Sequence, residues 1–412
     1  MLRDDVEVRG FADLDPRLRA MVLYEQNGAF DVQETAPVYS DLLATTPVLQ
    51  WDLGVAFFSR RDVVAAARDP RIVSTEPTSG EGFGMGTRDP LIPLHIDGDA
   101  HAAYRRLLDP LLTARQVAVW ADEIRSLADA LIDRFVAAGE TEFMSAFAAP
   151  LPGQTFLQIF GLPARDLETL VGFKDRILKH ETADLAAAEE TSRMAGDELR
   201  ALLCRRLSER KEGPVRDDLL GRFLTFELDG QSLSDDEIVN LMHMFTVAGL
   251  DTVTASLSLL VAWLATHPEE RRRLVGNPAL LPTAIEELLR VLSPVPYGGP
   301  RWATQDMEVN GVPVAKGSLV FLGWGTANVD PDSFDDPGAV DLARRPNPHL
   351  AFASGTHRCL GSHLARLELR IALEALHRRI PDYAIAPGKE PTYTLQGVRA
   401  CQVLPLVFTA SR

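Results

Sequence analysis

The stretch of residues 234–266 constrains the fold of this chain more than any other part of its sequence. It contains no proline and few charged residues after Glu237, so it predicts one helix of about thirty residues, on the order of 45–50 Å long. Ser234 and Glu237 form a capping-box pattern that marks the start of the helix. Because a helix that is apolar on almost every side is stable only inside protein, we expect it to cross the core.

Three residues interrupt the apolar pattern in the middle of this helix, namely Gly249, Asp251 and Thr252. A glycine, an acid and a hydroxyl are unfavourable in a buried apolar helix. Thr252 can donate a hydrogen bond to the carbonyl of Ala248, four residues earlier, and such a bond loosens the helical turn. We interpret this part of the helix as a candidate functional site.

Periodicity along the rest of the chain indicates a mainly α protein with a smaller β-rich region. Residues 1–50 contain three prolines and read as irregular, and a glycine- and proline-rich loop at 76–96 is either a substrate lid or a plain surface loop. No linker or low-complexity tract divides the chain, so we expect a single domain over residues 1–412. Helical periodicity covers residues 99–111, 115–138, 165–178, 184–210, 234–266, 282–292 and a segment from just after Cys359 to about 379, and strand patterns occur within 48–58, 295–322 and 381–408.

Charge and cysteine usage exclude several classes of function. The net charge is -16, which disfavours nucleic acid as a partner because phosphate binding needs a basic face. The charged N-terminus resembles neither a signal peptide nor a membrane anchor, and we read no apolar run as approaching the ~20 residues of a membrane span, so we expect a cytoplasmic protein. Cys204, Cys359 and Cys401 are too far apart for a disulfide framework or a zinc site.

The surroundings of Cys359 are the most informative local feature. Gly355 and Gly361 bracket the cysteine and allow backbone to approach a flat ligand, and a predicted helix follows directly. The positive end of that helix is expected to lower the pKa of the thiol and favour the thiolate. The alternative is a buried structural cysteine in a glycine-rich turn. That alternative would fit a lone cysteine, but it fits less well a cysteine that occurs together with a phenylalanine, two glycines, a histidine and a following helix.

The segment from Phe352 to Gly361 resembles the haem-binding signature of the cytochrome P450 family, F-x-x-G-x-x-x-C-x-G. Leu364-Ala365-Arg366 matches the family's continuation, whereas Ala353 stands where many members have glycine. The resemblance covers roughly residues 95–408. It implies the cytochrome P450 fold, in which the long central helix crosses the haem site, and a haem-thiolate monooxygenase that inserts one oxygen atom from O2 into its substrate. Cys359 would be the axial sulfur ligand of haem b (iron protoporphyrin IX).

A second motif, Glu287-Leu288-Leu289-Arg290, resembles the family's E-x-x-R pair. The two charged residues are three apart and share a helix face. An exposed pair on the surface of a helix, without any special role, would have the same spacing. Arg344 matches a third member of the family's cluster. The resemblance implies a structural role, in which bidentate Arg–carboxylate pairs hold the irregular segment before the cysteine loop.

Further site residues follow from the resemblance. Asp251 and Thr252 match the family's oxygen-activation motif and would organise proton delivery, with Thr252 as the hydroxyl near dioxygen and Asp251 as the relay from solvent. Haem propionates are carboxylates and need cationic or N–H donors, although a histidine in this region would by default be a surface residue. The residues that match cofactor contacts are His101, Arg105, Arg301, His357, Gly355 and Phe352.

The substrate pocket can be outlined from the same resemblance. Its expected walls are Phe83, Met85, Met244, Val247, Ala248, Val295, Tyr297 and Val398, a largely apolar set. This set suggests a small hydrophobic substrate such as a terpenoid, norisoprenoid, aromatic compound or fatty acid. The general resemblance is to soluble bacterial terpene and camphor-type hydroxylases, an analogy that does not fix the substrate.

Electrons must reach such an enzyme from another protein. The chain has no dinucleotide fingerprint and no cluster-type cysteine spacing, so we expect no bound flavin or NAD(P). The expected partner is a small acidic 2Fe–2S ferredoxin, or a flavodoxin, with an NAD(P)H-dependent reductase. Arg358, Arg106 and Arg115 form its candidate landing site, or are simply solvated. We expect no nucleic-acid or membrane partner, and a monomer.

Three other functions stay open. A peroxygenase would use hydrogen peroxide directly, but the presence of both Asp251 and Thr252 favours the dioxygen route. A haem-thiolate sensor would bind ligands without turnover and would usually carry an output domain. A helical protein without haem, whose motifs coincide by chance, is separated from both by its absorption spectrum.

Overall fold

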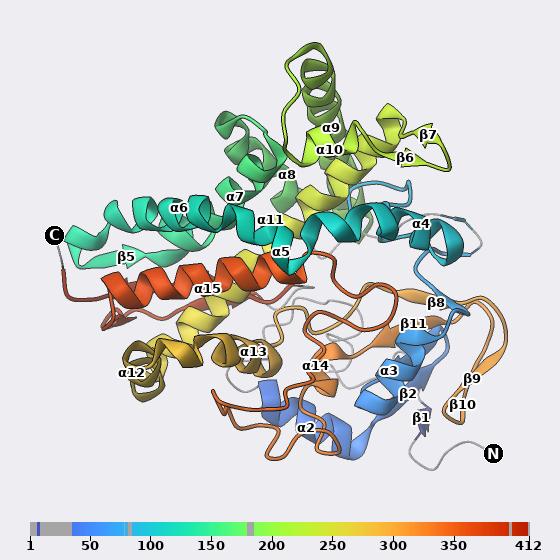
Figure 1. Ribbon diagram of the computed structural model, residues 1–412. Coiled ribbons are helices and arrows are strands. Elements are labelled where there is room, and N and C mark those ends of the chain that lie inside the picture. Colours follow the sequence, from blue (N-terminus) through green and yellow to red (C-terminus); the bar gives the residue numbers. More distant parts are fainter. Residues whose placement is uncertain are drawn as a thin grey trace.

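The computed structural model describes residues 6–8, 35–77, 79–80, 85–178, 185–394 and 398–410. Helices make up most of the described chain, and the strands are short (Figure 1). The helices are α2 (Thr35–Thr45), α3 (Arg60–Arg68), α4 (Gly98–Leu108), α5 (Ala114–Val117), α6 (Ala121–Asp133), α7 (Pro150–Phe160), α8 (Leu167–Leu178), α9 (Leu185–Glu212), α10 (Leu219–Phe223), α11 (Asp235–Thr266), α12 (Pro268–Gly276), α13 (Leu281–Leu292), α14 (Trp324–Ala327) and α15 (Ser362–Arg379).

The main sheet has six strands in the order β1-β2-β3-β11-β8-β4, and it lies with α2 and α3 apart from the large helices (Figure 1). β3 and β11 pair in parallel, whereas β8 pairs with β11 in the antiparallel direction. These strands are β1 (Val6–Val8), β2 (Val48–Trp51), β3 (Gly54–Phe57), β4 (Ile72–Val73), β8 (Arg301–Ala303) and β11 (Leu319–Leu322). The small sheets use β5 (Glu140–Glu142), β6 (Glu227–Leu228), β7 (Gln231–Ser232), β9 (Met307–Val309), β10 (Val312–Val314), β12 (Ala384–Ile385), β13 (Thr392–Thr394), β14 (Ala400–Val403) and β15 (Pro405–Val407). Strands occur in each of the three expected regions, and β1, β4, β5, β6 and β7 lie outside them.

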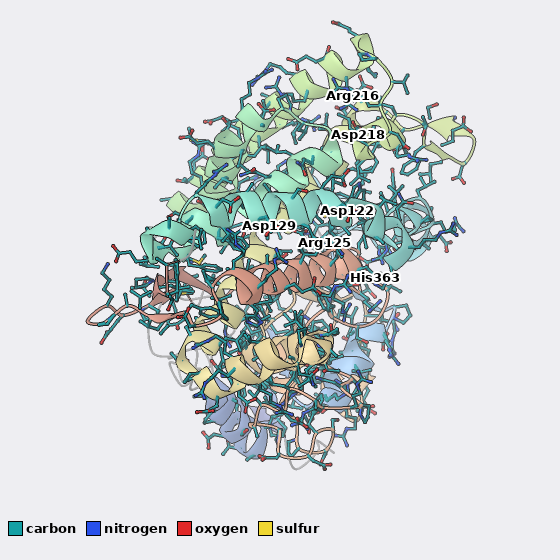
Figure 2. The ribbon with its side chains drawn as sticks, turned by 60° about the vertical axis from the view of Figure 1, so that its left-hand side comes forward. Asp122, Arg125, Asp129, Arg216, Asp218 and His363 are labelled. Atoms are coloured by element: carbon teal, nitrogen blue, oxygen red, sulfur yellow. The ribbon has the colours of Figure 1, made fainter. Side chains whose placement is uncertain are left out.

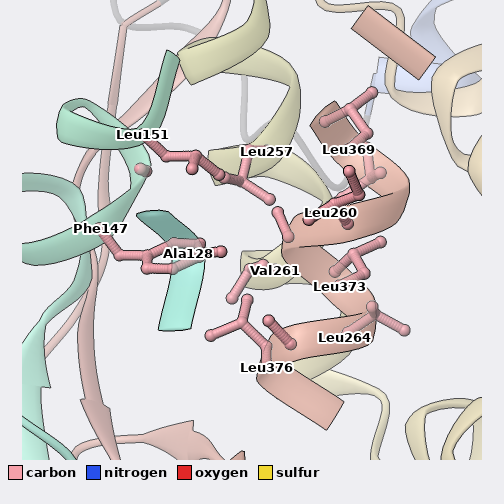
Figure 3. Close-up of a cluster of buried hydrophobic side chains, with 14 of the residues drawn as sticks. Ala128, Phe147, Leu151, Leu257, Leu260, Val261, Leu264, Leu369, Leu373 and Leu376 are labelled. Atoms are coloured by element: carbon pink, nitrogen blue, oxygen red, sulfur yellow. The ribbon is translucent and has the colours of Figure 1, made fainter. Parts of the chain in front are cut away.

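The long helix α11 crosses the core, as its apolar composition predicts. Its start is the expected capping box, in which Ser234 and Glu237 exchange side-chain and backbone hydrogen bonds. Near its C-terminal end, leucines and a valine of α11 face leucines of α15 on one side and α6 with the segment before α7 on the other (Figure 3). Burying one such side chain contributes about 1.5–3 kcal/mol, so this contact anchors α15 and the loop that precedes it.

One helix of the described residues, α11, is long and apolar enough to cross a membrane by length and composition. The sequence expectation that no apolar run approaches this length is therefore wrong. Its most apolar window has a mean hydropathy of 1.6, but 78% of that window is buried inside the protein. Packing in the core accounts for this composition, so the feature is weak evidence for a membrane span.

Polar contacts on the surface tie α6 to α15, which lie side by side (Figure 2). Arg379 on the last turn of α15 forms an ion pair with Asp133, with 2.6 Å between Nη2 and Oδ1. Arg378 pairs with Asp129, which is labelled on α6 in Figure 2. Exposed pairs of this kind contribute about 0–1 kcal/mol each, so the apolar contact dominates the packing of the two helices.

Two expectations about helices need correction. The segment 115–138 is not one helix: a 3-10 turn at Ala118–Trp120 separates α5 from α6, and a second one follows at Val136–Ala138. Residues 1–50 are not irregular throughout, because α2 spans Thr35–Thr45. Pro37 lies in the first turn of α2, where the missing N–H of proline would have no helical partner in any case.

Candidate active site

The cysteine loop is a tight turn between the irregular segment 328–350 and α15. The backbone N–H of Cys359 donates to the carbonyl of Phe352 at 2.9 Å, which closes the loop. Gly355 has a φ of 78°, and a Cβ on it would lie 2.2 Å from the carbonyl oxygen of Ala67 in α3. Only glycine fits there, so α3 and the loop are packed backbone to backbone.

The backbone conformation of Ala353 explains why many members of the family have glycine at this position. Its φ is 58°, in the left-handed region that costs a non-glycine residue roughly 1–2 kcal/mol. Gly361, in contrast, has a φ of -81°, and a Cβ on it would meet no atom within 4 Å. The loop therefore tolerates a strained alanine and leaves open space beside Gly361.

The sulfur of Cys359 lies outside the hydrophobic core clusters of the described residues, and the residue keeps accessible surface. Protein packed around the sulfur nevertheless raises the pKa of the thiol by desolvation, although the N–H of Gly361 and the charges of Arg105, Arg358 and Arg366 lower it. The sequence expectation of a lowered pKa is thus wrong for the protein alone, because desolvation outweighs the helix end. A bound metal ion would deprotonate such a thiol.

Three of the residues expected to contact propionates converge beside this loop. The rings of His101, on α4, and His357 lie 4.3 Å apart, and Arg301 begins β8 nearby. Nε2 of His357 hydrogen-bonds Oδ1 of Asp97 at 2.9 Å. His95 joins them, because the charges of His357 and Arg301 act on it.

Burial disfavours the cationic forms of the groups in this cluster. Desolvation and then the charge of His357 lower the pKa of both His95 and His101 to about 4. Burial also lowers the pKa of Arg301, against the opposing charge of Asp97. Nε2 of His101 and Nε of Arg301 are buried without a hydrogen-bond partner, in a protein where most buried donors have one.

Arg105, the fourth expected propionate residue, contacts the cysteine loop directly. Its guanidinium donates to the carbonyl of Arg358 at 2.9 Å and forms an ion pair with Asp109 at 2.7 Å. The bond to Arg358 connects α4 to the residue next to Cys359. The role of Arg105 toward a propionate stays a prediction.

The middle of α11 keeps accessible surface although the helix is otherwise buried. Ala248 and Thr252 are partly exposed and Gly249 is exposed, and a Cβ on Gly249 would come no closer than 3.8 Å to Phe156. The hydroxyl of Thr252 donates to the carbonyl of Ala248 at 3.0 Å, as the sequence predicts. This face of the helix is therefore not covered by side chains.

Asp251 points away from this face into a buried ion pair. Nζ of Lys174, on α8, lies 2.6 Å from Oδ1 of Asp251 and 2.6 Å from Oδ1 of Asp175. Burial would lower the pKa of Lys174, but the two carboxylates outweigh it and raise the pKa above its usual value. Sequence reasoning missed Lys174, because an isolated lysine on α8 has no motif around it.

Glu287, Arg290 and Arg344 form one charged cluster. Arg290 donates through Nε and Nη2 to the two carboxylate oxygens of Glu287, both at 2.8 Å, and Nε of Arg344 donates to the same carboxylate at 3.0 Å. Arg290 also donates to the carbonyls of Asn328, Pro337 and Ala339, at 2.7–2.9 Å. The cluster thus holds the irregular segment 328–339 against α13.

The expected pocket walls fall into two groups. Met244 and Val247 are buried on α11, and Val247 packs with Met85 in one hydrophobic cluster. Tyr297 packs in another cluster with Tyr39, and their hydroxyls lie 3.3 Å apart. Tyr297 and Val247 thus belong to different hydrophobic clusters of the described residues, and their place in one pocket stays a prediction. Ala248, Val295 and Val398 are partly exposed, and Phe83 lies outside the described residues.

A haem fits the groups that this site presents. Its propionates would give partners to the buried nitrogens of His101 and Arg301, and Cys359 would be the ligand of its iron. Cys359, the histidines and Thr252 come from α4, α11 and the loop before α15. No pair of these elements alone would make the site.

Known proteins are similar to this chain over most of its length. A family model described as Cytochrome P450 matches residues 184–380. Probable cytochrome P450 127A1 of Sinorhizobium fredii is 38% identical over 342 residues, 80% of this chain and 79% of that protein. Methyl-branched lipid omega-hydroxylase of Mycobacterium bovis is 32% identical over 363 residues, 84% of this chain and 82% of that protein. The crystal structure of P450BioI in complex with hexadec-9Z-enoic acid ligated acyl carrier protein has a TM-score of 0.83 and 28% identity, covering 92% of this chain and 99% of that chain.

The fold and the cysteine loop together define a class of haem enzyme. The chain belongs to the cytochrome P450 family. It is a cytochrome P450 monooxygenase, which uses haem and O2, works on hydrophobic substrates and needs a redox partner.

Proposed function

We propose that this protein is a cytoplasmic, monomeric haem b enzyme of one domain that hydroxylates a small hydrophobic substrate with electrons from a separate ferredoxin. The observation that carries the proposal is the pair of buried, unpartnered nitrogens of His101 and Arg301 beside the cysteine loop. Two carboxylates of a cofactor would satisfy these donors, and a charge-assisted hydrogen bond to each is a strong contact.

We assign binding roles to residues on both sides of the haem. Cys359 supplies the thiolate, and His101, His357, Arg301 and Arg105 hold the propionates. When bound, the haem supplies the activation of dioxygen that the family performs. Gly355 lets α3 close against the loop and so keeps the sulfur in place, and Phe352 accepts the hydrogen bond from the amide of Cys359.

Proton delivery is the role assigned to Thr252 and Asp251. The hydroxyl of Thr252 lies on the accessible face of α11 and can exchange its bond to Ala248 for one to a water molecule or to dioxygen. Asp251 is held by Lys174, so the carboxylate must leave this ion pair before it can take a proton from solvent. Lys174 therefore controls when Asp251 acts.

Replacing Thr252 by alanine is expected to separate electron use from product formation. NAD(P)H oxidation should continue, while product formed per NAD(P)H falls roughly tenfold or more, because a positioned acid–base group contributes at least this much. The measurement is the ratio of product to NAD(P)H consumed. Thr254→Ala is the matched control, because its hydroxyl also bonds a carbonyl four residues back but the residue is buried. If Thr252→Ala forms as much product per NAD(P)H as the wild type, Thr252 has no role in proton delivery.

The substrate is proposed from the chemistry of the pocket and from relatives. Met85, Met244 and Val247 offer an apolar surface to a hydrocarbon chain or ring. Among the expected classes, fatty acids share chemistry with the lipid omega-hydroxylase and with the acyl chain bound to acyl carrier protein in the P450BioI complex. A terpenoid has no such support, so we propose a fatty acyl compound first.

The electron donor is proposed to be an acidic 2Fe–2S ferredoxin served by an NAD(P)H-dependent reductase, with a flavodoxin as the substitute. Arg106, Arg115 and Arg358 are exposed, on α4, on α5 and in the cysteine loop. Arg358 is next to Cys359 in the chain, and an acidic partner would be steered to these charges despite the net charge of -16.

One series of measurements tests the whole proposal. The protein loaded with haem is expected to give the reduced carbon monoxide band of thiolate-ligated haem, and fatty acids are expected to shift its Soret band more than terpenoids do. Turnover is expected with ferredoxin, reductase and O2. Turnover only with hydrogen peroxide would indicate the peroxygenase, and ligand binding without any turnover would indicate the sensor. Absence of the thiolate band would end the proposal.

A further inference from the structure

A second charged cluster lies under the cysteine loop, next to the one around Glu287 but separate from it. Its centre is Glu286, on α13. Nε and Nη2 of Arg366, on α15, donate to the two carboxylate oxygens of Glu286, both at 2.7 Å. Nε2 of His349 lies 2.8 Å from Oε2 of the same carboxylate.

The hydrogen bonds of His349 define its tautomer. The backbone N–H of Ala351 donates to Nδ1 of His349 at 3.2 Å, so Nδ1 has its lone pair there. The ring hydrogen is therefore on Nε2, which donates to Glu286. The side chain of His349 is 3% exposed, and its Nε2 donates to the carboxylate at 2.8 Å.

The cluster contacts Phe352, the aromatic residue whose carbonyl is bonded to Cys359. The guanidinium carbon of Arg366 lies 4.2 Å from the ring centroid of Phe352, a close cation–π contact. The carbonyl of Phe352 accepts the N–H of Cys359. Displacing Arg366 would thus disturb Phe352, the residue whose carbonyl accepts the hydrogen bond of Cys359.

The arrangement also keeps the carboxylate of Glu286 negatively charged. Burial would raise the pKa of Glu286, but the hydrogen bonds from His349 and Arg366 outweigh it and hold the pKa at about 2. Glu286 is therefore ionised, and its negative charge offsets the positive charge of Arg366 near the sulfur. Arg290 and Arg344 do not share this task, because both bind Glu287.

We infer that Glu286 is a positioning residue that fixes Arg366 against Phe352 and balances its charge, so that the pair sets the reduction potential of the cysteine-bound haem. This inference rests on the proposed function, because it needs Cys359 as the haem ligand. A nearby positive charge stabilises the more electron-rich ferrous state, and a negative charge opposes it. Removing one partner must therefore shift the potential in the opposite direction from removing the other.

The test compares Glu286→Gln with Arg366→Gln in the haem-loaded protein by redox titration. At a fixed applied potential, the ratio of ferrous to ferric haem is expected to rise roughly fivefold in Glu286→Gln and to fall by about the same factor in Arg366→Gln. The double variant is expected to return close to the wild type. Glu374→Gln is the matched control, because Glu374 pairs with Arg370 on the same helix, at 3.8 Å, and we expect no shift.

A purely structural role predicts another pattern. Loosening the loop would move the potential in the same direction in both single variants, or would not move it beyond the control, and either result overturns the inference. If Glu286→Gln takes up no haem, Arg366→Lys is compared with Arg366→Gln: a wild-type potential in the lysine variant supports the charge assignment, and equal potentials refute it. A wild-type protein without the thiolate band would instead refute the proposed function itself.

Discussion

Replacing Cys359 by alanine is expected to abolish the reduced carbon monoxide band of thiolate-ligated haem and all monooxygenase turnover. The sulfur is the group that would donate electron density to the iron, and no other cysteine of the described residues lies in this loop. The variant is expected to stay folded, because Cys359 has accessible surface and belongs to no core cluster. Circular dichroism and the absorption spectrum measure the two effects on one sample.

Cys204→Ala is the matched control for this prediction. Cys204 is exposed on α9, far along the chain from the loop, so its removal should leave band and turnover unchanged. Cys401 is unsuited as a control because it is buried in the core and its N–H bonds Ser258 on α11. Retention of the thiolate band in Cys359→Ala would show that another residue is the ligand.

Replacing Glu287 by glutamine is expected to destabilise the protein by about 3–5 kcal/mol, the cost of removing one partner from a buried ion pair. The side chains of Glu287 and Arg290 are both 0% exposed, and Arg344 also depends on this carboxylate. Glutamine keeps the shape but leaves two guanidinium groups without their counter-charge. Because Arg290 holds the segment 328–339, haem retention should fall together with stability.

Urea unfolding followed by circular dichroism measures this loss. Glu270→Gln is the control, because Glu270 forms a longer pair with Arg273, 3.5 Å apart, on the surface of α12. Such an exposed pair contributes about 0–1 kcal/mol, so the control should change the midpoint little. A loss in Glu287→Gln no larger than that in the control would mean that the cluster is dispensable.

Much of the site was predictable because its signals are local in sequence. The segment Phe352–Gly361 carries its ligand, its turn glycine and its helix start within ten positions, and the i, i+3 spacing places Glu287 and Arg290 on one face. Thr252 and its bond to Ala248 follow from the helix period alone. Each of these features depends on residues that the chain itself keeps close.

The features that were missed depend on contacts between distant segments. Lys174 and Asp251 are 77 residues apart and meet only when α8 packs on α11. His95 and Asp97 join the cluster of His101, His357 and Arg301 only because the cysteine loop folds back onto the start of α4. The direction of the Cys359 pKa shift was also wrong, because burial depends on the whole surrounding and not on the nearest helix end.

By itself, the sequence determined the family, the long apolar helix, the cysteine that is the candidate iron ligand and the acid–hydroxyl pair within the helix, since each is written in a short pattern. Only the tertiary structure decided which charges meet, namely Lys174 on Asp251 and Arg366 and His349 on Glu286, and which buried nitrogens of His101 and Arg301 stay without a partner. The physical reason is that the energy of an ion pair or a hydrogen bond depends on how deeply its groups are buried and on which partner they meet. Neither exists until remote segments have packed together.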